Sequence, residues 1–241
     1  MALYDRNYAR EGVNASYEER IAERENALVS FVKETYKFFA GSLLFGTIGA
    51  YIALPFAPMI SGGAMFGIFA LEIISLIALA FLKEKPVVNV LLLFTFTFLT
   101  GVALVPLLYS VLALPAGVSI VAQALLGTTI VFGIMSLYAI KTKSDLSSWG
   151  KILFIALIGI IVASLINFVA GYFFGFQNAG LVSVVISGIA TIVFTLYIAF
   201  DTQNIIRGRY DSPIMAAISL YLDVYNLFVS LLHILGYANR D

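Results

Sequence analysis

Seven long apolar runs, separated by short polar or helix-breaking segments, dominate the pattern of the chain. Each run has roughly the 20 residues that an α-helix needs to cross a bilayer. The separators contain Pro, Gly or clustered charge, which end helices. Strands of a membrane barrel would be about half as long and would alternate apolar with polar positions. The pattern therefore predicts an all-α integral membrane protein whose seven spans cover approximately residues 38–57, 62–82, 87–109, 116–140, 152–174, 181–200 and 214–235.

Composition agrees with lipid as the solvent. Of the 241 residues, 61% are hydrophobic and 12% are charged, whereas a soluble domain carries about 25% charged residues. The composition therefore argues against an ordinary globular enzyme. The net charge is zero, so no nucleic-acid partner is predicted. The chain has no Cys and one His, and we expect neither a zinc site nor a bound cofactor.

The charges lie unevenly, and this predicts an orientation. Of the 14 Lys and Arg residues, 13 precede the first span or follow spans two, four and six, and Arg240 is the exception. Because basic residues resist translocation, we place the N-terminus in the cytoplasm and the C-terminus outside. Residues 1–30 read as a cytoplasmic leader and 31–241 as the membrane domain. The charged stretch 17–25 does not resemble a cleavable signal peptide.

Ser16 and Glu19 have the spacing of a capping box, which is typical of the start of a helix. A short cytoplasmic helix leading into the first span is one interpretation of the leader. A solvated, frayed segment is the other.

Three carboxylates remain inside the apolar spans, where an ionisable group is costly and rarely kept without a use. They are Glu72 in span two, Asp201 at the cytoplasmic end of span six, and Asp223 in span seven. All three can face one interior. Spans six and seven are antiparallel neighbours with a short connection, so we expect Asp201 and Asp223 to come within hydrogen-bonding distance.

Polar residues continue along the seventh span at helical spacing. The steps of four and three residues place Asp223 on one stripe with Ser219, Asn226, Ser230 and His233. On span two, Lys83 shares a face with Glu72. Its ammonium group can swing toward Asp201 or extend to the lipid headgroups.

Two carboxylates that share a site do not both ionise cheaply, so a proton shared by the aspartates is expected. Such a pair suits a proton sensor or relay. It could also bind a divalent cation through oxygen ligands or perform acid–base hydrolysis. The residues themselves leave these three chemistries open.

The sequences IAFDTQN (198–204), AISLYLDVYNLF (217–228) and LLHILG (231–236) resemble the C-terminal signature of the Bax inhibitor-1 family. The resemblance implies six helices around a central polar seventh, and a pH-sensitive calcium leak. It implies that Asp201 and Asp223 are the pH sensor and that Glu72 lines the ion path. Lys83 stands where some members have an Arg that latches the pair, although Lys lacks the bidentate fork of Arg.

Further expectations follow from this resemblance. The permeant ions would be Ca²⁺ and protons, with transient Ca²⁺ contacts at Glu72, Asp201 and Asp223. Neutral groups of span seven would line the path, namely Ser219, Asn226 and Ser230. Some bacterial relatives associate with a membrane AAA protease, so a regulator that binds such a partner without transport is an alternative. The tail lacks the Lys-rich extension of endoplasmic-reticulum members, which predicts a bacterial inner-membrane protein.

An intramembrane aspartyl protease is the enzymatic alternative, because such enzymes also carry aspartates on two neighbouring spans. Such enzymes carry a Tyr-Asp motif in one helix and a Gly-x-Gly-Asp motif in the next. Here Asp201 follows Phe200, and Asp223 follows Leu220-Tyr-Leu without a glycine. We therefore predict a protein that is not an enzyme.

Overall fold

The seven apolar runs form seven long α-helices, each apolar enough and long enough to cross a membrane, as predicted. The computed structural model describes residues 4–60, 62–82 and 85–240, with side chains from residue 18 onward. All regular structure in these residues is helical. The helices are α1 (Tyr4–Ala53), α2 (Gly63–Phe81), α3 (Pro86–Leu112), α4 (Gly117–Lys141), α5 (Gly150–Phe174), α6 (Ala179–Ile206) and α7 (Pro213–Ala238), with short 3-10 turns η1 (Leu54–Met59) and η2 (Leu146–Trp149).

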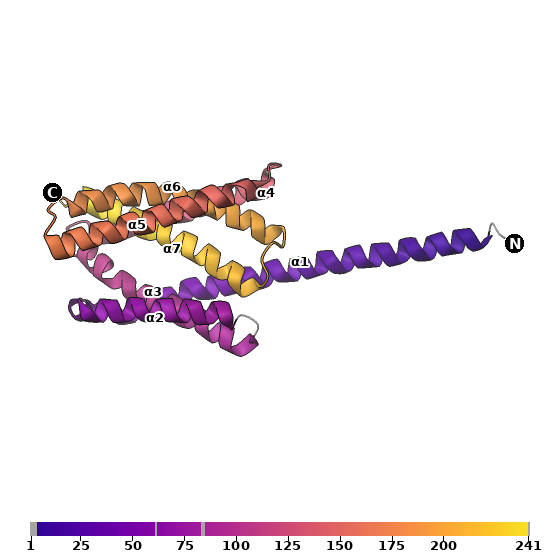
Figure 1. Cartoon of the computed structure of the whole chain (residues 1–241), viewed down its shortest axis with the longest axis horizontal. Helices are drawn as coiled ribbons and strands as arrows, with labels where there is room; N and C mark the ends of the chain where they lie inside the picture. Colours follow the sequence, from indigo (N-terminus) through magenta and orange to yellow (C-terminus); the bar gives the residue numbers. More distant parts are fainter. Residues whose placement is uncertain (1–3, 61, 83–84, 241) are drawn as a thin grey trace.

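The first helix is much longer than the first predicted span. It is continuous from Tyr4 to Ala53, and its N-terminal half extends away from the bundle (Figure 1). The interpretation of Ser16 as a helix start is therefore wrong. The leader is rich in Ala, Glu and Arg, which favour helix, so the backbone hydrogen bonding runs through this position.

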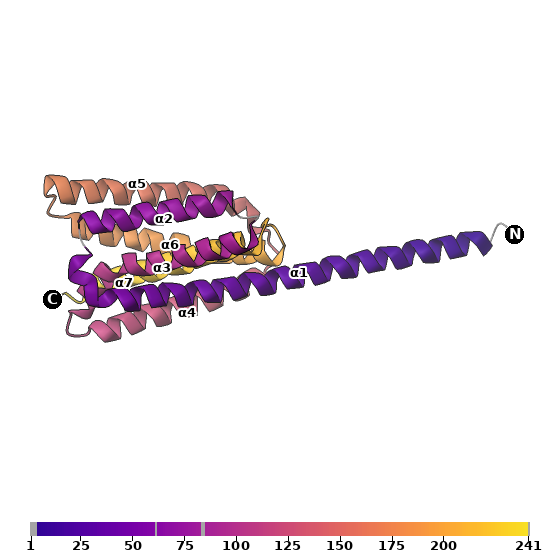
Figure 2. The ribbon, with the colours of Figure 1, turned by 90° about the horizontal axis from the view of Figure 1, so that it is seen from below.

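The last helix is the centre of the bundle, as the predicted arrangement requires. In α7, 56% of the apolar stretch is buried, against 39% in α3 and 11% in each of α2 and α5. It packs directly against α1, α3, α4 and α6. Helix α2 lies mainly on α3, and α5 lies mainly on α6 (Figures 1 and 2). Polar side chains on α7 are therefore shielded from lipid by neighbouring helices.

The turn between α6 and α7 is closely specified by its sequence. Gly208 adopts φ 61°, and the backbone N–H groups of Gly208 and Arg209 donate to the carbonyl oxygens of Ile205 and Asn204 at 3.0 and 2.9 Å. This is the Schellman arrangement that ends helices. Helix α7 then begins at Pro213. The Ser212 hydroxyl caps its N-terminus by accepting a hydrogen bond from the N–H of Met215. The two helices consequently run antiparallel from a short connection.

The connections gather at two ends of the bundle. The α4–α5 and α6–α7 connections lie at the end from which α1 projects, and the C-terminus lies at the other end (Figure 1). The first end carries Lys141, Lys143, Arg207 and Arg209, and we call it the basic end. The structure thus places these basic loops together, as the charge pattern predicts.

Candidate functional site

The structure brings Asp201 of α6 and Asp223 of α7 together near the basic end. Their carboxyl groups are in hydrogen-bonding contact, and the residues are only 4% and 5% exposed. A hydrogen bond between two carboxyl groups requires that one of them carries a proton, because two carboxylates alone offer only acceptors. The pair can therefore share and exchange a proton in a dry environment.

Asp201 lies farther from the helix end than the sequence indicated. We expected it at the end of the span, where hydropathy falls after Phe200, but α6 continues to Ile206. The polar residues that follow, Thr202, Gln203 and Asn204, are buried. They remain helical because the protein around them supplies hydrogen-bond partners that lipid would not.

Neighbouring polar side chains surround the pair. Tyr210, in the α6–α7 turn, donates its hydroxyl to the Asp201 carboxyl, and its oxygen also contacts the Ser219 hydroxyl. Burial, and secondarily the charge of Asp201, raises the pKa of Tyr210, so this hydroxyl remains a donor. Asn204 also hydrogen-bonds Asp201. The buried Oδ2 of Asp223 has no hydrogen-bond partner among the described residues.

Glu72 occupies a different place. It lies close to Tyr221 and Tyr225, whose hydroxyl groups bond to α3, Tyr225 donating to the carbonyl of Thr100 at 2.8 Å. Successive residues of a helix are rotated by 100°, so Tyr221 and Tyr225 are each about 200° from Asp223 around α7. The three carboxylates therefore do not share one interior. Among the described residues, no three acidic or His side chains converge as a metal site.

The polar stripe of α7 faces α6. Asp223 meets Asp201, and at the other end of α7 the Nδ1 of His233 lies 3.1 Å from the Ser187 hydroxyl of α6. Ser230 between them is buried. The Asn226 amide donates to the Leu222 carbonyl of its own helix at 2.8 Å. Asp223 and His233, two members of the predicted stripe, thus contact α6 near opposite ends of the α6–α7 interface.

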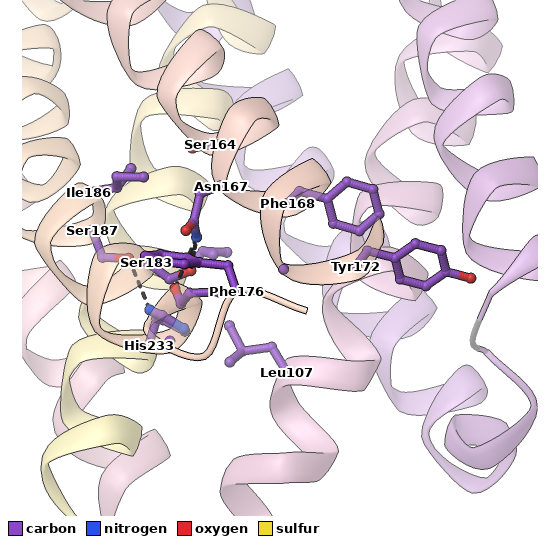
Figure 3. A pocket seen from close by; sticks show the side chains of 14 residues that line it. Leu107, Ser164, Asn167, Phe168, Tyr172, Phe176, Ser183, Ile186, Ser187 and His233 are labelled. Atoms are coloured by element: carbon purple, nitrogen blue, oxygen red, sulfur yellow. Dashed lines mark hydrogen bonds between the residues drawn. The ribbon is translucent and has the colours of Figure 1, made fainter. Parts of the chain in front are cut away.

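A cavity of about 670 Å³ lies beside His233, at the end of this interface opposite to the basic end. Figure 3 shows the side chains that line it. Helices α5, α6 and α7 line it with hydroxyl, amide and imidazole groups, including His233 and Ser187. Asn167 of α5 donates to the Ser183 hydroxyl at 2.7 Å and to the Ala179 carbonyl at 3.0 Å. From Ser187 to Asp201 is 14 residues of helix, or about 21 Å. The cavity and the aspartate pair therefore mark opposite ends of the same helix pair.

A loop contact at the basic end was not foreseen from the sequence. Gln203 of α6 bonds the α4–α5 connection, and Asp145 of that connection pairs with Arg207 and Arg209 beyond α6. The signal available was a polar run after Asp201 and one acidic residue in a basic loop, but neither identifies its partner. Lys83, the predicted latch, lies outside the described residues.

Comparison with known proteins places these features in a family. The family described as "Inhibitor of apoptosis-promoting Bax1" matches residues 28–240. An uncharacterised protein of Helicobacter pylori is 52% identical over 243 residues, covering all of both chains. An Escherichia coli K12 protein named "Modulator of FtsH protease YccA" is 33% identical over 174 residues, 71% of this chain and 76% of its own. The corresponding protein of a second E. coli strain, with the same identity and coverage, is named "Inner membrane protein YccA".

Proposed function

This chain belongs to the Bax inhibitor-1 family of membrane proteins, and on that premise we propose that it is a proton-sensitive calcium leak of the bacterial inner membrane. In this proposal Asp201 and Asp223 hold α6 and α7 together by sharing a proton. A change in protonation shifts the population between a closed and a permeable arrangement. The basic end faces the cytoplasm, in accord with the positive-inside rule. The protein has no enzymatic step.

One observation carries this proposal, namely the contact between two buried carboxyl groups across two helices. Loss of the shared proton would leave like charges adjacent in a medium of low dielectric constant, where their repulsion is much stronger than in water. Separation of α6 from α7 would relieve it. Moving an equilibrium between two arrangements from 1:99 to 99:1 needs only about 5.5 kcal/mol, so protonation of one buried pair is a sufficient source.

The proposed route for the ion follows the α6–α7 interface. Ser219, Asn226 and Ser230 offer neutral oxygen or amide groups along α7, and the cavity near His233 would admit a hydrated ion at the far end. Calcium prefers oxygen ligands and tolerates flexible coordination. Glu72 lies on the opposite face of α7 from Asp223, so any contact that it makes with the ion is separate from the pair.

We expect Asp201→Asn and Asp223→Asn each to abolish the pH dependence of calcium flux into liposomes that contain the purified protein. The amide cannot gain or lose the shared proton, whereas its size matches the carboxyl group. Glu34→Gln, a similar change at an exposed residue of α1, is the control and should retain the wild-type pH profile. Wild-type pH dependence in both aspartate variants would contradict the proposal.

A second function, modulation of a membrane protease, has its own support. A relative that is 33% identical is named a modulator of FtsH protease. In this chain the N-terminal half of α1 projects beyond the bundle, where another protein could reach it (Figure 2). We do not propose an aspartyl protease, because both aspartates are buried and no glycine precedes Asp223 within the LYL stretch to admit a substrate backbone.

A further inference from the structure

The α4–α5 connection is bonded to the basic end of α6 through one buried side chain. Gln203 is 1% exposed. Its Oε1 accepts from the Leu146 N–H at 2.7 Å, and its Nε2 donates to the Ser144 carbonyl at 2.9 Å. Both polar ends of the amide are therefore satisfied by the backbone of the connection. Because buried polar groups are costly without partners, α6 holds this segment in a defined position.

Two arginines that follow α6 bind the same segment. Asp145 accepts a bidentate pair of hydrogen bonds from Arg209, with Nη1–Oδ1 and Nη2–Oδ2 distances of 3.0 and 2.8 Å. Arg207 Nη1 lies 3.1 Å from Oδ1. Asp145 also caps η2 by accepting from the Ser147 N–H at 2.9 Å. Bidentate geometry within a network makes this contact stronger than an isolated surface ion pair.

These contacts lead to the aspartate pair. Arg209 Nη1 donates to the Asn204 Oδ1 at 3.3 Å, and Asn204 in turn hydrogen-bonds Asp201. Tyr210, the neighbour of Arg209 in the chain, donates to Asp201 as well. Arg209, which binds the α4–α5 connection, is thus linked to Asp201 of the proposed sensor through one side chain, that of Asn204.

We propose that Asp145, Gln203 and Arg209 form a clamp that positions the α6–α7 turn and so keeps Asp201 and Asp223 in contact. This inference rests on the proposed leak. Asp145 and Arg209 touch no ion and carry no sensed proton in it; they are positioning residues. Opening the clamp would free the turn and weaken the closed arrangement.

The clamp itself does not titrate in the range in which the pair would act. Hydrogen bonds from Arg209 hold the pKa of Asp145 well below its usual range, and the same contact raises the pKa of Arg209. Arg207 is the other charged group bonded to Asp145. Because the pKa of Asp145 is lowered, its ion pair with Arg209 is present at every pH at which an ordinary carboxyl group is ionised. The ion pair is lost only on strong acidification. The clamp therefore sets the basal leak and leaves proton sensing to the pair.

A double-mutant cycle tests the clamp. In liposomes, Asp145→Asn and Arg209→Gln should each raise calcium flux by about threefold to tenfold. The comparison is made at pH values at which the aspartates share a proton and the wild-type protein is closed. The double variant should leak less than the product of the two single effects, because both changes remove the same Asp145–Arg209 bonds. Asp145→Glu should restore most of the closure. Lys143→Gln, at an exposed residue of the same connection, should leave the flux unchanged.

Hydrogen exchange supplies a readout that does not depend on flux. The Leu146 amide should exchange faster in Asp145→Asn than in wild type. If flux in both single variants equals wild type while Asp201→Asn abolishes pH dependence, the clamp is overturned and the leak stands. Additive effects in the double variant would indicate general damage and would also overturn the clamp. A wild-type protein without pH-dependent flux would overturn both proposals.

Discussion

Buried and half-buried polar side chains form two groups on opposite faces of α7. One group contains Asp201, Asp223 and Tyr210 at the α6 side. The other contains Glu72 with Tyr221 and Tyr225 at the α3 side. The buried Oε1 of Glu72 has no hydrogen-bond partner among the described residues. The helix backbone separates the two groups, so substitution in one need not disturb the other.

We expect Glu72→Gln to keep the wild-type pH at half-maximal calcium flux, whatever its effect on the amplitude of the flux. The reason is that Glu72 contacts neither aspartate. The measurement is a pH series of flux in liposomes, with Asp223→Asn as the variant that should lose the dependence. A displaced pH profile in Glu72→Gln would instead mean that Glu72 and the pair titrate together.

Between elements, the closest packing joins α1 and α3. A Cβ added at Gly101 would collide with the Gly46 carbonyl oxygen, and one added at Gly49 would collide with the Phe98 carbonyl oxygen. In lipid, small residues at an interface allow helix backbones to approach closely and gain van der Waals contact. These glycines therefore allow the backbones of α1 and α3 to lie against each other.

We expect Gly101→Ala to destabilise the protein by about 1–3 kcal/mol, the usual cost of overpacking. Gly133→Ala is the matched control, because a Cβ there meets nothing within 4 Å, and Ala favours helix over Gly by up to ~1 kcal/mol. Thermal unfolding of the purified protein in detergent should show a lower midpoint for the first variant only. Equal midpoints for the two variants would show that the backbones do not meet at Gly101.

In the whole molecule, the two halves of α1 have different surroundings. Its C-terminal half packs against α3 and α7 in the bundle, whereas its N-terminal half projects away from it (Figure 1). The projecting part carries most of the charge that precedes the spans. A leak and a partner-binding role would therefore depend on different parts of the molecule.

Deletion of residues 1–24 should leave pH-dependent calcium flux in liposomes intact, because it spares Leu28, which lies against Gly208 of the α6–α7 turn, and the aspartate pair and its clamp lie elsewhere. The same deletion should abolish co-purification with a membrane AAA protease if the second function holds. The full chain carrying Asp223→Asn is the complementary control, with impaired pH response and normal binding. Loss of flux on deletion would show that the leader is part of the leak.

The sequence by itself determined the seven spans, the basic end and the polar stripe of α7. Each of these depends on local terms, namely the transfer of apolar residues to lipid, the retention of Lys and Arg on one side, and the helical repeat. The sequence also identified Asp201 and Asp223 as neighbours, because a short turn leaves an antiparallel pair little freedom.

Only the tertiary structure decided which polar atoms meet across helices. Hydropathy does not fix the rotation of a helix about its axis, and one residue of rotation is 100°. Glu72 could therefore be expected beside the aspartates yet lie on the opposite face of α7. The same holds for Gln203 and Asp145, whose partners are 57 and 64 residues away in the chain. Such contacts depend on how whole helices pack, which no local pattern records.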